Sequence, residues 1–465
     1  MLEPNVKVKM KRSQRLLDKY FSGETMDYRQ MIALFIPILV DQAFVVGLNL
    51  VNTAMISSSG VAAISAVNMI DSLNIFLISV FIAVSTGGTV VVAQYKGSRN
   101  ELMVSKASAG AVSSVSLMAL LIGLFGIIFH NPLLNLLFGA ASPEVMANAR
   151  TYLIGSSISY LGIAVVEAVC GALRGIGRTR ASLVLSLIMN LTYVALNLVF
   201  INLLHMGVLG MTFSVNIARY LGALCALYYL LRLDSSLHIR IRDLWRVQLS
   251  MVKKIMFIGM PFAAEQMFFN GGKILTQIFI VSLGTYAIAT NAISSTFAGM
   301  MQIPAGALSL TIITVVGQCM GSGHVKDARK FTKSFIVLSS ASFVLMGLLV
   351  LPLFMPLVSL FHPPDEIVGD IFLIVLINTI AQIPLWSIAF ITPSALRAAG
   401  DSKFTSMVSM LSMWLFRVVL GYILGIALDF GILGVWIAMN CEWGVRGIIF
   451  MRRFLGEKWS RHRVI

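Results

Sequence analysis

The chain has 465 residues, of which 58% are hydrophobic and 12% are charged. Soluble domains carry about 25% charged residues, roughly twice this fraction. A soluble core cannot hide so much apolar surface, so the composition excludes an ordinary soluble protein and predicts a membrane protein. The formal net charge is +15, but the charged residues lie between apolar segments and no nucleic-acid-binding motif is present. Nucleic acid is therefore not expected as a partner.

Twelve apolar segments are long enough to cross a hydrocarbon core, which takes about 20 helical residues. In chain order they span residues 30–56, 66–94, 105–130, 147–172, 182–203, 208–232, 254–282, 288–318, 331–359, 368–394, 404–427 and 431–454. We therefore predict a basic N-terminal segment (1–29), an N-lobe (30–232), a connector (233–253), a C-lobe (254–455) and a tail (456–465).

Basic residues gather in every second connection between these segments. They are Lys96, Arg99 and Lys106, then Arg174, Arg178 and Arg180, then His324, Lys326, Arg329, Lys330 and Lys333, then Arg397 and Lys403. The intervening connections carry carboxylates and almost no Lys or Arg, with Arg150 as the clearest exception. Short basic loops stay in the cytoplasm, so the pattern predicts a multi-pass protein of the cell inner membrane with both termini cytoplasmic.

Chemistry-bearing motifs are missing from the sequence. Four cysteines, Cys170, Cys225, Cys319 and Cys441, each lie in an apolar stretch without the spacing of a zinc site. No catalytic dyad, phosphate-binding loop or metal cluster is visible, so we expect neither an enzyme nor a bound metal or cofactor.

Short motifs recur about 224 residues apart along nearly the whole chain. Pro37 to Gln42, with Asp41, returns as Pro261 to Gln266, with Glu265. Three further pairs keep the same offset to within one residue: 93–98 with 317–322, 172–177 with 395–400, and 207–216 with 431–440. The sequence therefore predicts an internal duplication.

Because each copy has an even number of spans, the two copies enter the membrane in the same sense and form parallel repeats. The expected fold is an all-α polytopic membrane protein in which twelve transmembrane helices form two lobes around a central cleft. Rocking one lobe against the other gives alternating access, which favours a secondary transporter over a channel. The sequence predicts a monomer, with a small molecule as substrate and the lipid bilayer as its surroundings.

These repeated signatures resemble the multidrug and toxic compound extrusion (MATE) family over nearly all of residues 30–455. The most specific matches are Val92-Ala-Gln-Tyr-x-Gly97, Ala172-Leu-Arg-Gly-Ile-Gly177 and residues 395–401, Ala-Leu-Arg-Ala-Ala-Gly-Asp. The resemblance implies twelve helices in two lobes, a V-shaped cleft, and efflux driven by the entry of Na⁺ or H⁺, which would be coupling ions rather than cofactors.

The chain departs from the family pattern at three polar positions. Asn52 stands where many members carry an aspartate in the first helix. In the fifth helix, the Asn-x-x-x-Asp pair of some relatives is replaced by Tyr193 and Asn197, and Trp386 stands at an acidic position of the tenth helix. The usual coupling residues therefore cannot simply be transferred to this chain.

Ionisable residues at membrane depth are costly and are functional candidates by default. Asp41 and its repeat counterpart Glu265 each follow a helical proline by four residues, where a proline frees a backbone carbonyl one turn earlier. Burial favours the protonated carboxyl and a nearby cation favours the charged one, so proton and substrate can compete for one group. Glu167, Asp71, Asn52 and Asn197 are further candidates for coupling or substrate binding.

Three basic residues also lie at membrane depth and need partners. They are Arg417, Lys273 and Arg219. We expect Glu265 to pair with Arg417 or Lys273, whereas Glu442 and Arg446, four residues apart on one helix, are expected to pair with each other.

The leading functional hypothesis is an efflux antiporter that exchanges small amphipathic, cationic drugs or metabolites for Na⁺ or H⁺. The alternatives are a flippase for a lipid-linked precursor and an exporter of one endogenous metabolite. The major facilitator fold also has six and six spans, but its characteristic loop after the second helix is absent, where residues 96–99 read Lys-Gly-Ser-Arg.

Overall fold

The computed structural model describes residues 12–465 apart from 58, 140, 234–238, 246–247 and 463. In this part of the chain the regular structure is helical, as predicted. The N-terminal half forms α1 (Arg12–Phe21), α2 (Tyr28–Ser57), α3 (Val61–Gly97), α4 (Glu101–Ile128), α5 (His130–Phe138), α6 (Pro143–Gly175), α7 (Thr179–Asn197), η1 (Leu198–Leu203), α8 (Gly207–Tyr228), η2 (Tyr229–Leu233) and α9 (Ile241–Trp245).

The C-terminal half forms α10 (Leu249–Ser282), α11 (Thr285–Gly321), α12 (Val325–Val350), α13 (Phe354–Ser359), α14 (Asp365–Ala381), η3 (Gln382–Trp386), α15 (Ser387–Ala398), α16 (Ser402–Ser412), η4 (Met413–Leu420), η5 (Ile423–Ala427), α17 (Gly431–Leu455) and η6 (Lys458–Arg461). The elements η1 to η5 are π-helical turns that continue the α-helices beside them, whereas η6 is a 3₁₀ turn.

Twelve long helices cross the molecule in the described residues. Judged by length and composition alone, eleven of them are long and apolar enough to span a membrane. The twelfth is α10, which is 34 residues long and carries four charged side chains: Lys253, Lys254, Glu265 and Lys273. The expected all-α polytopic fold is thereby confirmed.

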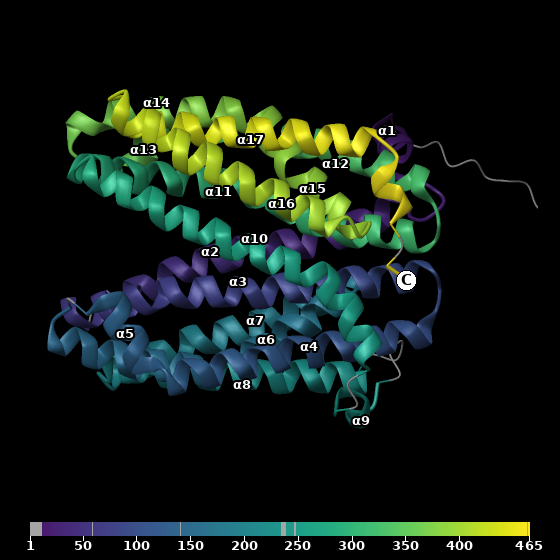
Figure 1. Ribbon diagram of the computed structural model, residues 1–465, viewed down its shortest axis with the longest axis horizontal. Helices are drawn as coiled ribbons and strands as arrows, with labels where there is room; N and C mark the ends of the chain where they lie inside the picture. The colour runs from purple at the N-terminus through teal and green to yellow at the C-terminus, as the bar shows by residue number, and fades with distance from the viewer. Residues whose placement is uncertain (1–11, 58, 140, 234–238, 246–247, 463) are drawn as a thin grey trace, which may run out of the picture.

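The two groups of six helices form two layers along the long axis of the molecule, with α3 to α8 in one layer and α11 to α17 in the other (Figure 1). The first helix of each group reaches toward the opposite group, since α10 packs on α3 and α2 packs on α11. Helix α1 and the C-terminus lie at the same end of the molecule (Figure 1), which we call the terminal end.

The backbone records the duplication as clearly as the sequence does. Ten of the eleven described residues with positive φ fall into five pairs at the repeat offset, including Gly60 with Gly284 and Gly177 with Gly400. The φ values agree to within 10° in four of the five pairs, at 95° and 98° for Gly60 and Gly284 and at 90° and 100° for Gly177 and Gly400. Left-handed backbone favours glycine, so these positions explain why glycines recur at helix boundaries.

Two predicted segments are only partly covered by the structure. Of the N-terminal segment 1–29, residues 1–11 lie outside the described residues, and Thr25 binds Asp327 of α12, with 2.9 Å between its amide nitrogen and the carboxylate Oδ2. Of the connector 233–253, residues 234–238 and 246–247 lie outside the described residues, and the described part contains α9.

Candidate functional site

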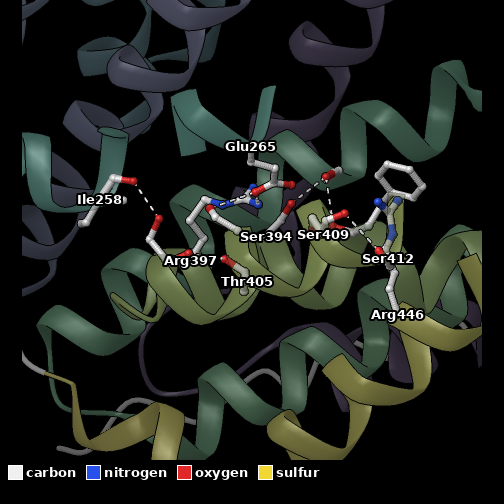
Figure 2. A network of polar contacts seen from close by, with 12 residues as sticks. Ile258, Glu265, Ser394, Arg397, Thr405, Ser409, Ser412 and Arg446 are labelled. Atoms are coloured by element: carbon white, nitrogen blue, oxygen red, sulfur yellow. Dashed lines mark hydrogen bonds and ion pairs between the residues drawn. The ribbon is translucent and has the colours of Figure 1, made fainter. Parts of the chain in front are cut away.

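In the C-lobe, Glu265 and Arg397 form a buried ion pair. Arg397 Nη2 donates to Glu265 Oε2 at 2.9 Å, and the hydroxyl of Ser406 donates to the same oxygen at 3.0 Å. The side chains of Arg397 and Glu265 are only 6% and 10% exposed. Three helices meet here, α10, α15 and α16, and Figure 2 shows the two charged side chains turned toward each other.

The expected partners of Glu265 were wrong. Arg417 instead binds Glu442, with 2.7 Å between Nη2 and Oε2, and Lys273 lies over the ring of Phe269 and makes no ion pair within the described part of the chain. The hypothesis failed because it considered only basic residues inside the predicted membrane spans. Arg397 had been placed in a connection between two spans.

A second C-lobe cluster confirms the other expected pair and extends it. Glu442 binds Arg446, four residues later on α17, with 3.0 Å between Oε1 and Nη1. One carboxylate, fully buried, therefore lies between two buried guanidinium groups, Arg417 and Arg446. Arg417 lies on the π-helical turn η4, and such turns are frequent at functional sites.

A double-mutant cycle tests the Glu265 pairing. Breaking a buried pair leaves one uncompensated charge, so Glu265→Gln and Arg397→Gln are each expected to lower the free energy of unfolding by about 3–5 kcal/mol. The double variant is expected to lose less than the sum, with a coupling energy of about 0.5–3 kcal/mol. Unfolding followed by tryptophan fluorescence in mixed micelles measures it. Additive losses for this pair, or coupling of Glu265 to Arg417 instead, would contradict the assignment.

The N-lobe carries the repeat counterpart of this pair, but in an open form. Asp41 corresponds to Glu265, Arg174 to Arg397 and Ser182 to Ser406 at offsets of 223 or 224 residues. Arg174 Nη1 donates to Ser182 at 3.4 Å, and Asp41 interacts with Ser186 and Arg174. Unlike Glu265, Asp41 has a buried oxygen, Oδ1, with no hydrogen-bond partner among the described residues.

A third charge distinguishes the N-lobe site. Glu167 Oε2 lies 3.8 Å from Arg174 Nη2, and its electrostatic neighbours include Asp41. The counterpart of Glu167 in the C-lobe is Phe390, 223 residues later. The structure thus brings two carboxyl groups to one arginine in the N-lobe, where the C-lobe has one carboxyl for one arginine.

Asp71 and Arg219 belong to a separate polar cluster of the N-lobe. Tyr152 donates to Asp71 Oδ1 at 2.9 Å, and Arg219 donates to Ser159 at 2.7 Å and is an electrostatic neighbour of Asp71. Asn197 is fully buried and interacts with Tyr193, which joins it to this cluster. The side chain of Asn52 lies outside the described residues.

The two lobes are bonded together at the terminal end by a symmetric pair of glutamines. Gln94 Nε2 at the end of α3 donates to the carbonyl of Ala398 at 2.8 Å. Gln318 Nε2 at the end of α11 donates to the carbonyl of Gly175 at 3.0 Å. Donors and acceptors are both related by the repeat, and each acceptor follows the arginine of a carboxylate–arginine site by one residue.

Glycines allow the backbones to meet at this point. A Cβ on Gly97 would overlap the carbonyl of Gln318, and a Cβ on Gly321 would overlap the carbonyl of Gln94. Only a residue without a side chain permits this approach of α3 and α11. We call Gln94, Gln318, Gly97 and Gly321 together the glutamine latch.

The residues of the glutamine latch, together with Arg174 and Arg397, belong to the recurring motifs. The sequence alone assigned them no role. The available signal was the recurrence itself, because a glutamine kept in both halves beside a glycine and near an Ala-Leu-Arg motif is more specific than apolar helix packing requires. No group of three or more His, Cys, Asp or Glu side chains in the described residues is arranged to hold a metal ion.

Known proteins match the chain along most of its length. The MatE family model matches residues 37–199 and again residues 261–423, two stretches that keep the repeat offset. The uncharacterized transporter YisQ of Bacillus subtilis (strain 168) is 26% identical over 441 residues, covering 92% of this chain and 94% of its own. The probable multidrug resistance protein NorM of Thermotoga maritima is 24% identical over 447 residues, covering 94% of each.

The fold is also that of a solved transporter. A structure described as the outward-facing conformation of a multidrug resistance MATE family transporter of the MOP superfamily superposes with a TM-score of 0.83 at 19% identity, covering 98% of this chain and 99% of that chain. The proteins that this chain matches are transporters rather than enzymes. Because the family model matches both halves over the ranges that hold the two carboxylate–arginine sites, the chain belongs to the MATE family of multi-pass multidrug efflux transporters.

Proposed function

We propose that the protein is an antiporter that exports small amphipathic compounds in exchange for H⁺ or Na⁺, and that Asp41 is the carboxyl group through which the ion acts. The supporting observation is the difference between two carboxyl groups related by the repeat. Glu265 is held by Arg397 and Ser406 through the same oxygen, whereas Asp41 keeps a buried oxygen without a hydrogen-bond partner in the described residues. A buried, underbonded carboxylate is ready to accept a proton or a cation.

Arg174 links Asp41 to the hydrogen bonds that hold the two lobes together at the terminal end. Its side chain faces Asp41 and Glu167, while its carbonyl accepts a hydrogen bond from Thr314 of α11 at 3.0 Å. The next residue, Gly175, accepts the bond from Gln318. Protonation of Asp41 changes the charge balance around Arg174 and hence the position of the end of α6, whose Gly175 carbonyl accepts one hydrogen bond of the glutamine latch.

The terminal end is proposed to face the cytoplasm. The connections predicted to be basic, which hold Lys96, Arg178, Lys330 and Lys403 among others, follow the helices that end there (Figure 1). Positive loops are retained on the cytoplasmic side. A latched terminal end then corresponds to a transporter closed toward the cytoplasm, and twelve helices in one chain suffice for a functional monomer.

The N-lobe charges favour cationic substrates. Asp41 and Glu167 share the single guanidinium of Arg174, so this site carries one negative charge in excess when both are ionised. An excess buried charge attracts a counter-ion. A lipid-linked precursor or a single endogenous metabolite remains the alternative cargo and is an outcome of the experiment below.

Transport of ethidium into proteoliposomes, under an imposed pH or Na⁺ gradient, tests the proposal. Asp41→Asn keeps the size of the side chain and removes its titration, so gradient-driven transport is expected to fall to the background level. Substitution of a sole coupling group leaves no route for the ion to do work, because an ion can shift the equilibrium only through differential binding.

The matched control is Glu101→Gln, an exposed carboxyl at the start of α4 whose neighbour Lys96 lies 3.7 Å away. This variant is expected to transport like the wild type. Gradient-driven transport that survives in folded Asp41→Asn would move the coupling role to another carboxyl group. Absence of ethidium transport in the wild type under both gradients would instead favour the lipid-linked or endogenous cargo.

A further inference from the structure

A small cavity of about 160 Å³ lies between the lobes beside the Glu265–Arg397 pair. Helix α3 of the N-lobe contributes Ile82 and Thr86 to its wall, and the remaining wall comes from α10, α11, α15, α16 and α17 of the C-lobe. Pockets for whole drug-sized ligands span about 300–1,000 Å³, so this cavity fits one end of such a molecule.

Positive charge is in excess around this cavity. Arg397 and Arg446 both line it, whereas Glu265 is the single carboxylate in its wall. That carboxylate is already engaged by Arg397 and by Ser406. The carboxylate of Glu442, which faces Arg446, is shared with Arg417.

Arg446 has donors to spare. It is 2% exposed, and its Nε and Nη2 have no hydrogen-bond partner in the described part of the chain. Its guanidinium carbon lies 4.1 Å from the ring centroid of Phe390, a cation–π contact. Unused charged donors in a buried site are unfavourable, so their presence in a cavity wall calls for an acceptor from outside the chain.

Neutral donors and apolar walls complete the site. Ser394 and Ser309 lie 2.8 Å apart through their hydroxyl oxygens, and Ser409 lines the cavity as well. In Figure 2, Arg397, Ser394, Ser409 and Arg446 follow one another across the network. The rings of Phe262, Phe269 and Phe390 supply the apolar wall of the same space.

We propose that this cavity binds the carboxylate end of an amphipathic substrate, with Arg446 as the principal contact through Nε and Nη2. A guanidinium presents paired N–H groups that match the two oxygens of a carboxylate. The inference rests on the proposed transport function and extends its substrates to amphipathic anions and zwitterions. A zwitterion would offer a cation for the acidic N-lobe and an anion for the C-lobe.

Equilibrium binding separates this inference from the transport proposal. The full-length protein in lipid nanodiscs is titrated with dansylglycine and with dansylglycinamide, which differ only in a carboxylate against an uncharged amide. Hydrogen bonds to charged groups are strong, so the wild type is expected to bind the carboxylate about tenfold or more tightly than the amide.

Arg446→Gln is expected to remove this preference, weakening dansylglycine about tenfold and leaving dansylglycinamide within about twofold. Glu442 keeps Arg417 as its partner in this variant, so the buried charges stay balanced. Glu442→Gln/Arg446→Gln, which removes one charge of each sign, repeats the test at the net charge of the wild type. The control Arg461→Gln removes an exposed arginine that lines no part of this cavity and should alter neither affinity.

Equal affinities of the wild type for the two probes would overturn the proposal, even if ethidium transport proceeds normally. A carboxylate preference that persists in either variant would overturn it too. A preference found in the wild type and lost in folded Arg446→Gln supports the site, whether or not a gradient drives transport.

Discussion

A methyl group placed on Gly321 is expected to open the terminal end of the molecule and abolish transport. In Gly321→Ala the new Cβ overlaps the carbonyl of Gln94, which belongs to a backbone that cannot rotate away. Overpacking of this kind costs about 1–3 kcal/mol. Such an energy shifts an equilibrium between two conformations by about 5- to 150-fold.

Spin labels at the exposed positions Leu102 and Lys326, introduced as cysteines after replacing the native ones, report the separation of the two lobes at this end. We expect the distance to lengthen in Gly321→Ala and in Gly97→Ala. Gly306→Ala is the matched control, because it lies on the same helix α11 and its new methyl group would meet no atom within 4 Å. An unchanged distance with normal transport in Gly321→Ala would show that the latch is not needed.

The largest loss of stability is expected from Glu442→Gln. This carboxylate is fully buried between Arg417 and Arg446, so its neutralisation leaves two guanidinium groups without a counter-charge. Breaking a buried pair by removing one partner costs about 3–5 kcal/mol. Unfolding in mixed micelles, followed by tryptophan fluorescence, is expected to show a loss at or above this range.

A second glutamate–arginine pair with the same spacing provides the control. Glu457 and Arg461 are also four residues apart, with 3.3 Å between their charged atoms, but their side chains are 73% and 76% exposed. Exposed pairs contribute little to stability because water and salt screen them. Glu457→Gln should therefore unfold like the wild type, and a similarly small effect of Glu442→Gln would mean that water reaches the buried cluster.

The two lobes are built on one plan but differ in charge. At the repeat-related sites, the N-lobe places Asp41 and Glu167 around Arg174, whereas the C-lobe closes Glu265 on Arg397 and adds the Arg417–Glu442–Arg446 cluster. The proposed division of labour follows from this difference, with ion coupling in the first lobe and an anion subsite beside the second.

The sequence by itself determined the number of spans, the duplication and the Glu442–Arg446 contact. Spans depend on local hydropathy, the duplication is recorded in recurring motifs, and the contact depends only on the pitch of a single helix. None of these requires knowledge of how helices pack. The resemblance carried by the Ala-Leu-Arg and Gln-x-x-Gly motifs likewise identified the family to which the chain belongs.

Only the tertiary structure decided which charges meet across helices. Glu265 and Arg397 are 132 residues apart, and Gln94 and Ala398 are 304 apart. Whether such residues touch depends on the rotation of each helix about its axis and on where the helices cross, which packing of whole lobes sets. For the same reason, the sequence did not predict that Glu265 pairs with Arg397, which it placed in a connection between two spans.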